Sequence, residues 1–176
     1  ISGSGNLTIK PSETTKSIAI GKATGDQVVT QQTLDNIDLT GILTFGAAKE
    51  IIFKNSVLVD RSSGNGLNLI ADENIEFSAA STLFLLRSLS ASSNKGSITI
   101  KDSTISARVR ENSTNSEGPA VALLSGGQFS SSQSQPVTFS DCSTCDISIN
   151  NSFVAGYSAV NGSFNPALFM GSSGGI

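Results

Sequence analysis

Hydrophobic and polar residues alternate in short stretches from one end of the chain to the other. Examples are Leu7-Thr8-Ile9, Leu67-Asn68-Leu69, Ile98-Thr99-Ile100 and Ile147-Ser148-Ile149. A period of two is typical of β-strands that bury one face. Segments rich in Gly, Asn and Ser, such as Ser63-Gly64-Asn65-Gly66, separate these stretches and indicate turns. We therefore predict an all-β protein built from many short strands.

The spacing of the apolar pairs predicts how these strands are arranged. Steps of about 8 and about 16 residues dominate, which indicates a structural repeat of roughly 20 to 25 residues, a period typical of solenoids. Tight Asn-Gly hairpin turns are scarce, whereas bends of one or two small polar residues are common. We predict a right-handed parallel β-helix of about six to seven coils. An antiparallel β-sandwich, which also has strands every 8 to 12 residues, is the alternative.

The segment 30–37 is the one stretch that favours a helix. Thr30 is a suitable N-cap, and Leu34 and Ile37 are placed to face the core. We predict a single helical turn here.

Length and composition limit the function classes. The 176 residues suit one domain, and we treat 1–176 as a single β-helical domain, a segment or processed part of a longer chain. Charged residues make up 14%, and the net charge of -3 gives no basic surface for nucleic acid or anionic lipid. No run of about 20 apolar residues predicts a membrane span. Histidine is absent, which excludes Ser-His-Asp and Cys-His catalysis.

Residues 9–46 carry a pattern that goes beyond composition. A Pro-Ser loop leads to an Ile-Ala-Ile-Gly strand, a Gly turn, a Thr-Leu-Asp-Asn-Ile element and a final strand. The positions are Pro11-Ser12, Ser17 to Gly21, Gly25, Val29-Thr30, Thr33 to Ile37 and Gly41 to Gly46. This order and spacing resemble a segment of large secreted β-helical exoproteins of the filamentous haemagglutinin type. The pattern departs from that family at Ala19, where Gly is usual, at Thr33, where an acid is usual, and in the final Leu-Thr-Phe strand. Parts of the remaining chain have a weaker similarity to polymorphic outer-membrane repeat proteins.

The resemblance implies an extracellular or cell-surface rod without catalytic residues or cofactors. We expect a non-enzymatic structural or adhesive module, either part of a large secreted adhesin or a subunit of a surface filament or sheath. Its expected partners are copies of itself, neighbouring coils of a parent chain, and glycans of a host or neighbouring cell surface. Neither end has a recognisable polar cap in the sequence, which suits continuation into more coils or end-to-end assembly.

Cys142 and Cys145 form the most conspicuous motif. A single Cys-x-x-Cys pair without histidine cannot complete a four-ligand zinc site within the chain. A strand-to-helix context, as in redox-active pairs, is also lacking. For a secreted protein, we predict a local disulfide that fixes a bend, with free thiols as the alternative.

Several carboxylate groups suggest a second function class. They are Asp72-Glu73 with Glu76, Asp35 with Asp38, and Asp141 with Asp146. Paired carboxylates hydrolyse glycosides, and a polysaccharide-active β-helix enzyme is the alternative to the structural reading. We favour solvated or turn-capping roles, because subsites rich in aromatic and basic residues are lacking. The calcium-binding loop pattern Asp-x-Asp-x-Asp is also absent.

Aromatic residues and threonines suggest a third class, a module that binds glycans or ice. The nine phenylalanines lie in or beside alternating strands, and we predict stacked core ladders rather than a sugar-binding face. They are Phe45, Phe53, Phe77, Phe84, Phe129, Phe139, Phe153, Phe164 and Phe169. Thr99, Thr104 and Thr138 alternate locally but do not form the regular array that an ice-binding face needs.

Four Asn-x-Ser/Thr sequons occur, at Asn6, Asn112, Asn150 and Asn161. They are glycosylation candidates if the source glycosylates exported proteins. The stretch from Arg108 to Glu111 predicts a strand end that leads into a solvated loop.

Overall fold

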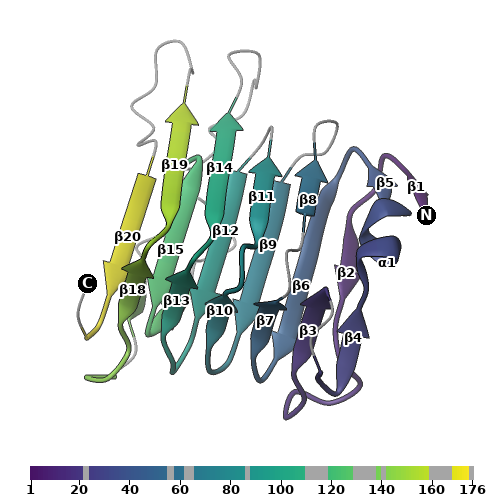
Figure 1. The fold of residues 1–176 in the computed structure, drawn as a ribbon. Helices are drawn as coiled ribbons and strands as arrows, with labels where there is room; N and C mark the ends of the chain where they lie inside the picture. Colours follow the sequence, from purple (N-terminus) through teal and green to yellow (C-terminus); the bar gives the residue numbers. More distant parts are fainter. Residues whose placement is uncertain are drawn as a thin grey trace.

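In the computed structural model of the protein, three parallel β-sheets run along one axis (Figure 1). The structure describes residues 1–21, 24–54, 58–61, 66–85, 88–109, 119–128, 138–139, 142–158 and 168–174. Within these residues the chain forms a parallel β-helix, in agreement with the fold class predicted from the sequence.

Each sheet contains strands that are far apart in the sequence. Sheet 1 consists of β2 (Leu7–Ile9), β6 (Ile42–Ala48), β9 (Gly66–Ala71), β12 (Ser88–Ser93), β15 (Val121–Ser125) and β20 (Leu168–Ser172). Sheet 2 consists of β4 (Gln27–Val29), β3 (Ile18–Gly21), β7 (Ile51–Lys54), β10 (Ile75–Phe77), β13 (Ile98–Lys101) and β18 (Ile147–Asn150). Sheet 3 consists of β8 (Leu58–Arg61), β11 (Thr82–Leu85), β14 (Thr104–Val109) and β19 (Phe153–Ser158).

Two short strand pairs lie outside these sheets. β1 (Ser2–Gly3) pairs in parallel with β5 (Asp38–Leu39). β16 (Gly127–Gln128) pairs with β17 (Thr138–Phe139), and among the described strands this is the one antiparallel pair. The antiparallel sandwich is therefore excluded as the arrangement of the sheets.

The register gives the length of each coil. Leu43 of β6 pairs with Leu67 of β9, and Leu67 pairs with Leu89 of β12, so successive turns take 24 and 22 residues. These two lengths fall in the range that the apolar spacing predicts, whereas the turns from Leu7 to Leu43, from Leu89 to Val121 and from Val121 to Leu168 take 36, 32 and 47 residues and exceed it. The chain passes from sheet 1 to sheet 2 to sheet 3 and back, for example through β6, β7, β8 and β9, and sheet 1 stacks six strands deep.

Like residues superpose in the core because each coil repeats the previous one. On sheet 2 an isoleucine ladder runs through all layers from β3 to β18, and its members are at most 3% exposed: Ile18, Ile51, Ile75, Ile98 and Ile147. The next inward column carries Ile20, Phe53, Phe77, Ile100 and Ile149. Apolar side chains stacked in this way exclude water along the whole axis, which is the main stabilising contribution of a solenoid.

The predicted helical turn is present as α1 (Gln31–Asp35). The Thr30 hydroxyl accepts a hydrogen bond from the Thr33 N–H (3.2 Å), which satisfies a donor that the helix start leaves without a partner. Leu34 is buried and Ile37 packs against the core, as the sequence predicts. The helix lies at the N-terminal end of the stack (Figure 1). It corrects the expectation that neither end is capped.

Candidate functional site

The cysteine pair lies at the corner that leads into β18. Cys142 and Cys145 are joined in a disulfide, with their Cα atoms 5.5 Å apart. The carbonyl oxygen of Cys142 accepts a hydrogen bond from the Ser173 hydroxyl (2.8 Å), and that of Cys145 accepts one from the Gly174 N–H (3.0 Å). Cys145 is fully buried. The bridge thus fixes a bend whose backbone also holds the segment after β20.

Two of the four sequon asparagines lie in the described residues. Asn6 is exposed, but its Oδ1 accepts a hydrogen bond from the Ile42 N–H (2.8 Å) and so joins the first two layers of sheet 1. Asn150 is exposed at the end of β18. Asn112 and Asn161 lie outside the described residues.

Asp72 and Glu73 lie at the corner before β10, and Glu76 lies within that strand; each of the three carboxylates faces a lysine. Lys95 pairs with Asp72 (3.8 Å), Lys49 with Glu73 (3.6 Å) and Lys54 with Glu76 (3.7 Å). Asp35 accepts a hydrogen bond from the Gln31 side chain (2.8 Å) rather than meeting Asp38. Asp146 is exposed, and Asp141 lies outside the described residues.

A shallow depression of about 330 Å³ on the outer face of sheet 2 brings together two carboxylates that the sequence analysis did not pair. Glu50, in the layer of β7, and Glu76, in the layer of β10, line it together with Asn74, which precedes β10. Glu50 accepts a hydrogen bond from the Asn74 amide (3.0 Å), and Glu76 is paired with Lys54. A general acid for glycoside hydrolysis needs a pKa raised by burial, whereas these side chains are partly exposed and already have partners. In the described part of the chain, no group of three or more His, Cys, Asp or Glu residues could hold a metal ion.

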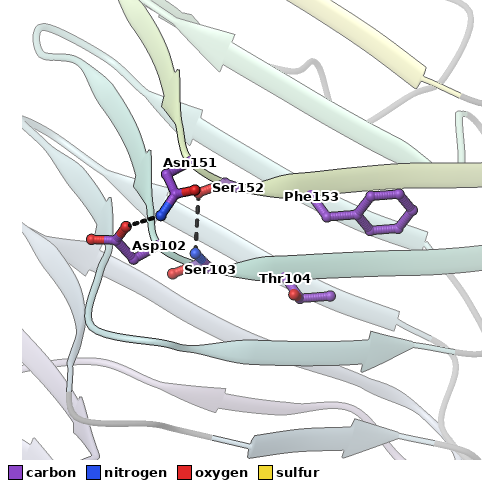
Figure 2. A pocket seen from close by; sticks show the side chains of 6 residues that line it. All are labelled: Asp102, Ser103, Thr104, Asn151, Ser152 and Phe153. Atoms are coloured by element: carbon purple, nitrogen blue, oxygen red, sulfur yellow. Dashed lines mark hydrogen bonds between the residues drawn. The ribbon is translucent and has the colours of Figure 1, made fainter.

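A second depression, of about 550 Å³, lies at the corner between sheets 2 and 3 in the layers of β14 and β19. Figure 2 shows its lining residues: Asp102, Ser103, Thr104, Asn151, Ser152 and Phe153. Asp102 and Asn151 have positive φ angles of 49° and 45°, a left-handed conformation that Asp and Asn tolerate better than most residues. The turn thereby directs the two side chains toward each other, and the Asn151 amide donates to Asp102 Oδ1 at 2.7 Å (Figure 2).

The outer face of sheet 3 carries exposed aromatic rings. Phe84 is 50% exposed, Phe153 60% and Tyr157 54%, and the Arg108 guanidinium lies 5.0 Å from the centre of the Tyr157 ring. The prediction that the phenylalanines form core ladders holds for Phe45, Phe53 and Phe77, which are fully buried. It is wrong for Phe84 and Phe153, because Leu83 and Leu85 take the inward positions of β11, and Val154 takes the inward position beside Phe153.

The C-terminal layer leaves part of the core uncovered. Ile149 occupies the same inward column as Ile20, Phe53, Phe77 and Ile100, which are completely buried, yet Ile149 is 40% exposed. Leu168 is 37% exposed in a sheet 1 column whose inner members Leu43, Leu67, Leu89 and Val121 are at most 1% exposed; Leu7, at the other end of this column, is partly buried. β18, β19 and β20 are each the terminal strand of their sheet. We call this surface, formed by β18, β19 and β20, the open end.

Comparison with protein-family models, with curated proteins and with solved structures gave no match to this chain. The resemblance of residues 9–46 to haemagglutinin-type exoproteins therefore stays a prediction. Among the described residues, no helix has the length and apolarity to cross a membrane.

Proposed function

We propose that the chain is a non-enzymatic, extracellular β-helix module with a structural or adhesive role, continued along its axis at the open end. The observation that carries this proposal is the difference in burial along one core column. Val29 of β4, which ends this column at the N-terminal end, is 3% exposed, whereas Ile149 of β18, at the open end, is 40% exposed.

The physical argument is that a solenoid end leaves two kinds of group unsatisfied. The terminal strands present backbone N–H and C=O groups without neighbours, and the exposed core residues lose their hydrophobic contacts. Completing the burial of one large apolar side chain contributes up to about 1.5 to 3 kcal/mol, so covering Ile149, Leu168 and the partly buried Met170 stabilises the fold appreciably. A further β-layer satisfies both needs at once.

The N-terminal end distinguishes the two forms of the proposal. There β4 pairs with β3, and α1 places Leu34 against the core. A filament that grows head to tail needs both ends to accept a neighbour. The geometry therefore favours a module of a larger adhesin, whose next coils cover the open end, over a filament subunit.

Three further features support an extracellular, non-catalytic role. Cys142 and Cys145 form a disulfide, which persists mainly in oxidising compartments. The surface is poor in charge, and the carboxylates near one another are held by lysines or amides. The resemblance of residues 9–46 points to the same class of secreted proteins.

Two measurements test the proposal. Sedimentation velocity of the purified chain at rising concentration is expected to show association that stops at a dimer, joined through two open ends. Continued growth of the particles supports the filament form instead. Incubation with a panel of neutral and acidic polysaccharides is expected to release no reducing or unsaturated ends. Release of either supports the enzyme alternative.

A further inference from the structure

The depression at the corner between sheets 2 and 3 has polar atoms that the protein does not use. Asp102 Oδ1 accepts from the Asn151 amide, and the Ser152 hydroxyl accepts from the Ser103 N–H (3.1 Å). Ser103 and Ser152 each donate to a backbone carbonyl of their own turn. For Asp102 Oδ2, Asn151 Oδ1 and the Thr104 hydroxyl, no hydrogen bond to another described residue is present. Three polar groups therefore remain for a ligand.

An exposed aromatic ring lines the same depression as these groups. Phe153 pairs with Thr104 across the two layers, so their side chains are neighbours on the outer face of sheet 3. With 60% of its surface exposed, the ring offers an apolar face at one side of the depression, and Asp102 and Asn151 lie at the other side (Figure 2). The depression has a volume of about 550 Å³, which lies within the range of small-ligand sites.

We propose that this depression binds a neutral oligosaccharide. A sugar ring presents C–H groups on one face, which pack on the electron-rich face of an aromatic ring, and hydroxyls at its edge, which donate and accept hydrogen bonds. Phe153 supplies the stacking face, and Asp102, Asn151 and Thr104 bind the hydroxyls. This inference rests on the adhesive part of the proposed function and names its ligand class and site.

The charge of the site selects neutral over acidic glycans. Asp102 is the one ionisable group among the lining residues, and the ion pairs of the described residues lie elsewhere. Its carboxylate accepts hydrogen bonds from hydroxyls but repels uronic-acid and sulfate groups.

The test uses the whole chain displayed on beads, so that many weak contacts add up to measurable retention. The beads are applied to a microarray that carries neutral oligosaccharides in some spots and uronic-acid or sulfated oligosaccharides in others. Phe153→Ala is expected to lower retention on neutral glycans by about tenfold, because the stacking face is lost. Asn151→Gly keeps the left-handed backbone while removing the amide and is expected to lower retention as well.

Phe84→Ala is the matched control. Phe84 has a similar exposure on the same face of sheet 3 but does not line the depression, so its removal is expected to leave retention unchanged. Thermal unfolding of each variant checks that the fold persists.

Three results overturn the inference. They are no retention of the wild-type chain on neutral glycans, preferential retention on acidic glycans, and equal losses for Phe84→Ala and Phe153→Ala. None of them bears on association through the open end, which sedimentation measures separately, so the two proposals fail independently.

Discussion

The rings of Phe53 and Phe77 stack in the core, with centroids 4.8 Å apart and planes inclined by 16°. The two residues are register partners in β7 and β10, and the centroid distance matches the spacing of hydrogen-bonded strands. The parallel register therefore sets the geometry of the stack. Both side chains are completely buried, so their contacts are lost together if one ring is removed.

Phe77→Ala is expected to lower the free energy of unfolding by about 3 to 5 kcal/mol, because it leaves a ring-sized cavity between Phe53 and Ile100. Urea denaturation monitored by circular dichroism measures the change. Phe84→Ala removes the same ring from the outer face and is expected to cost less than about 1 kcal/mol. Equal costs would contradict the assignment of inward and outward faces.

Ala79 and Ala80 stand in the turn between β10 and β11 with φ angles of 57° and 62°. A left-handed conformation costs a non-glycine residue roughly 1 to 2 kcal/mol. Glycine avoids this cost, but its greater freedom in the unfolded chain offsets part of the gain. Ala80→Gly is therefore expected to stabilise the protein by up to about 1 kcal/mol in thermal denaturation. Ala107→Gly, at a buried strand position without positive φ, is expected to destabilise it.

Asp26 joins the loop after β3 to the residue that precedes this strand. Its Oδ2 accepts hydrogen bonds from the Ser17 N–H (2.9 Å) and the Ser17 hydroxyl (3.1 Å), and these bonds lower the pKa of Asp26 below its ordinary value. A lowered folded-state pKa contributes stability that is present above the unfolded-state pKa and is lost as the pH falls through the folded-state pKa.

We therefore expect Asp26→Asn to be less stable than the wild type at neutral pH. The difference should disappear at an acidic pH, once the pH has fallen through the lowered folded-state pKa and Asp26 is uncharged in the folded and the unfolded chain. Urea denaturation at the two pH values measures it. Asp38→Asn, at another exposed aspartate, serves as the control. A difference that persists at low pH would mean that the charge of Asp26 is not the cause.

The disulfide closes a loop of sequence separation 3, so its effect on the unfolded chain is small. Reduction is expected to lower the free energy of unfolding by no more than about 2 kcal/mol. Mass spectrometry after alkylation, without and with prior reduction, tests whether the bridge is present in protein recovered from its natural source. Alkylation of Cys142 without reduction would show free thiols there and would weaken the case for an oxidising compartment.

The coil and its core follow from local pattern, which is why the sequence predicted them. Ile18, Ile75 and Ile98 each begin a stretch with period two, and the parallel register of sheet 2 stacks these stretches in one column. Thr30 and Leu34 define the helical turn through contacts within one segment and with the nearest core residues.

The candidate glycan site depends on contacts that no local pattern contains. Asp102 and Asn151 are 49 residues apart in the chain, about twice the 24 and 22 residues of the turns from β6 to β9 and from β9 to β12. Phe153 is an apolar residue of a type common in cores. Its ring lies outside because the next residue in the strand, Val154, points inward. A strand pattern tells which residues share a face, but the register with neighbouring strands decides which face is buried.

The open end is the central claim, and a pair of variants at opposite ends of sheet 2 tests it most directly. Ile149 lies in β18, the last strand of that sheet, and Val28 lies in β4, the first, where it is 46% exposed. Sedimentation velocity over the same concentration range is expected to show that Ile149→Lys abolishes the association of the wild-type chain, because a charge cannot be buried between two apolar ends. Val28→Lys is expected to leave it intact. A wild-type chain that stays strictly monomeric, or association that Val28→Lys abolishes and Ile149→Lys does not, would contradict the account.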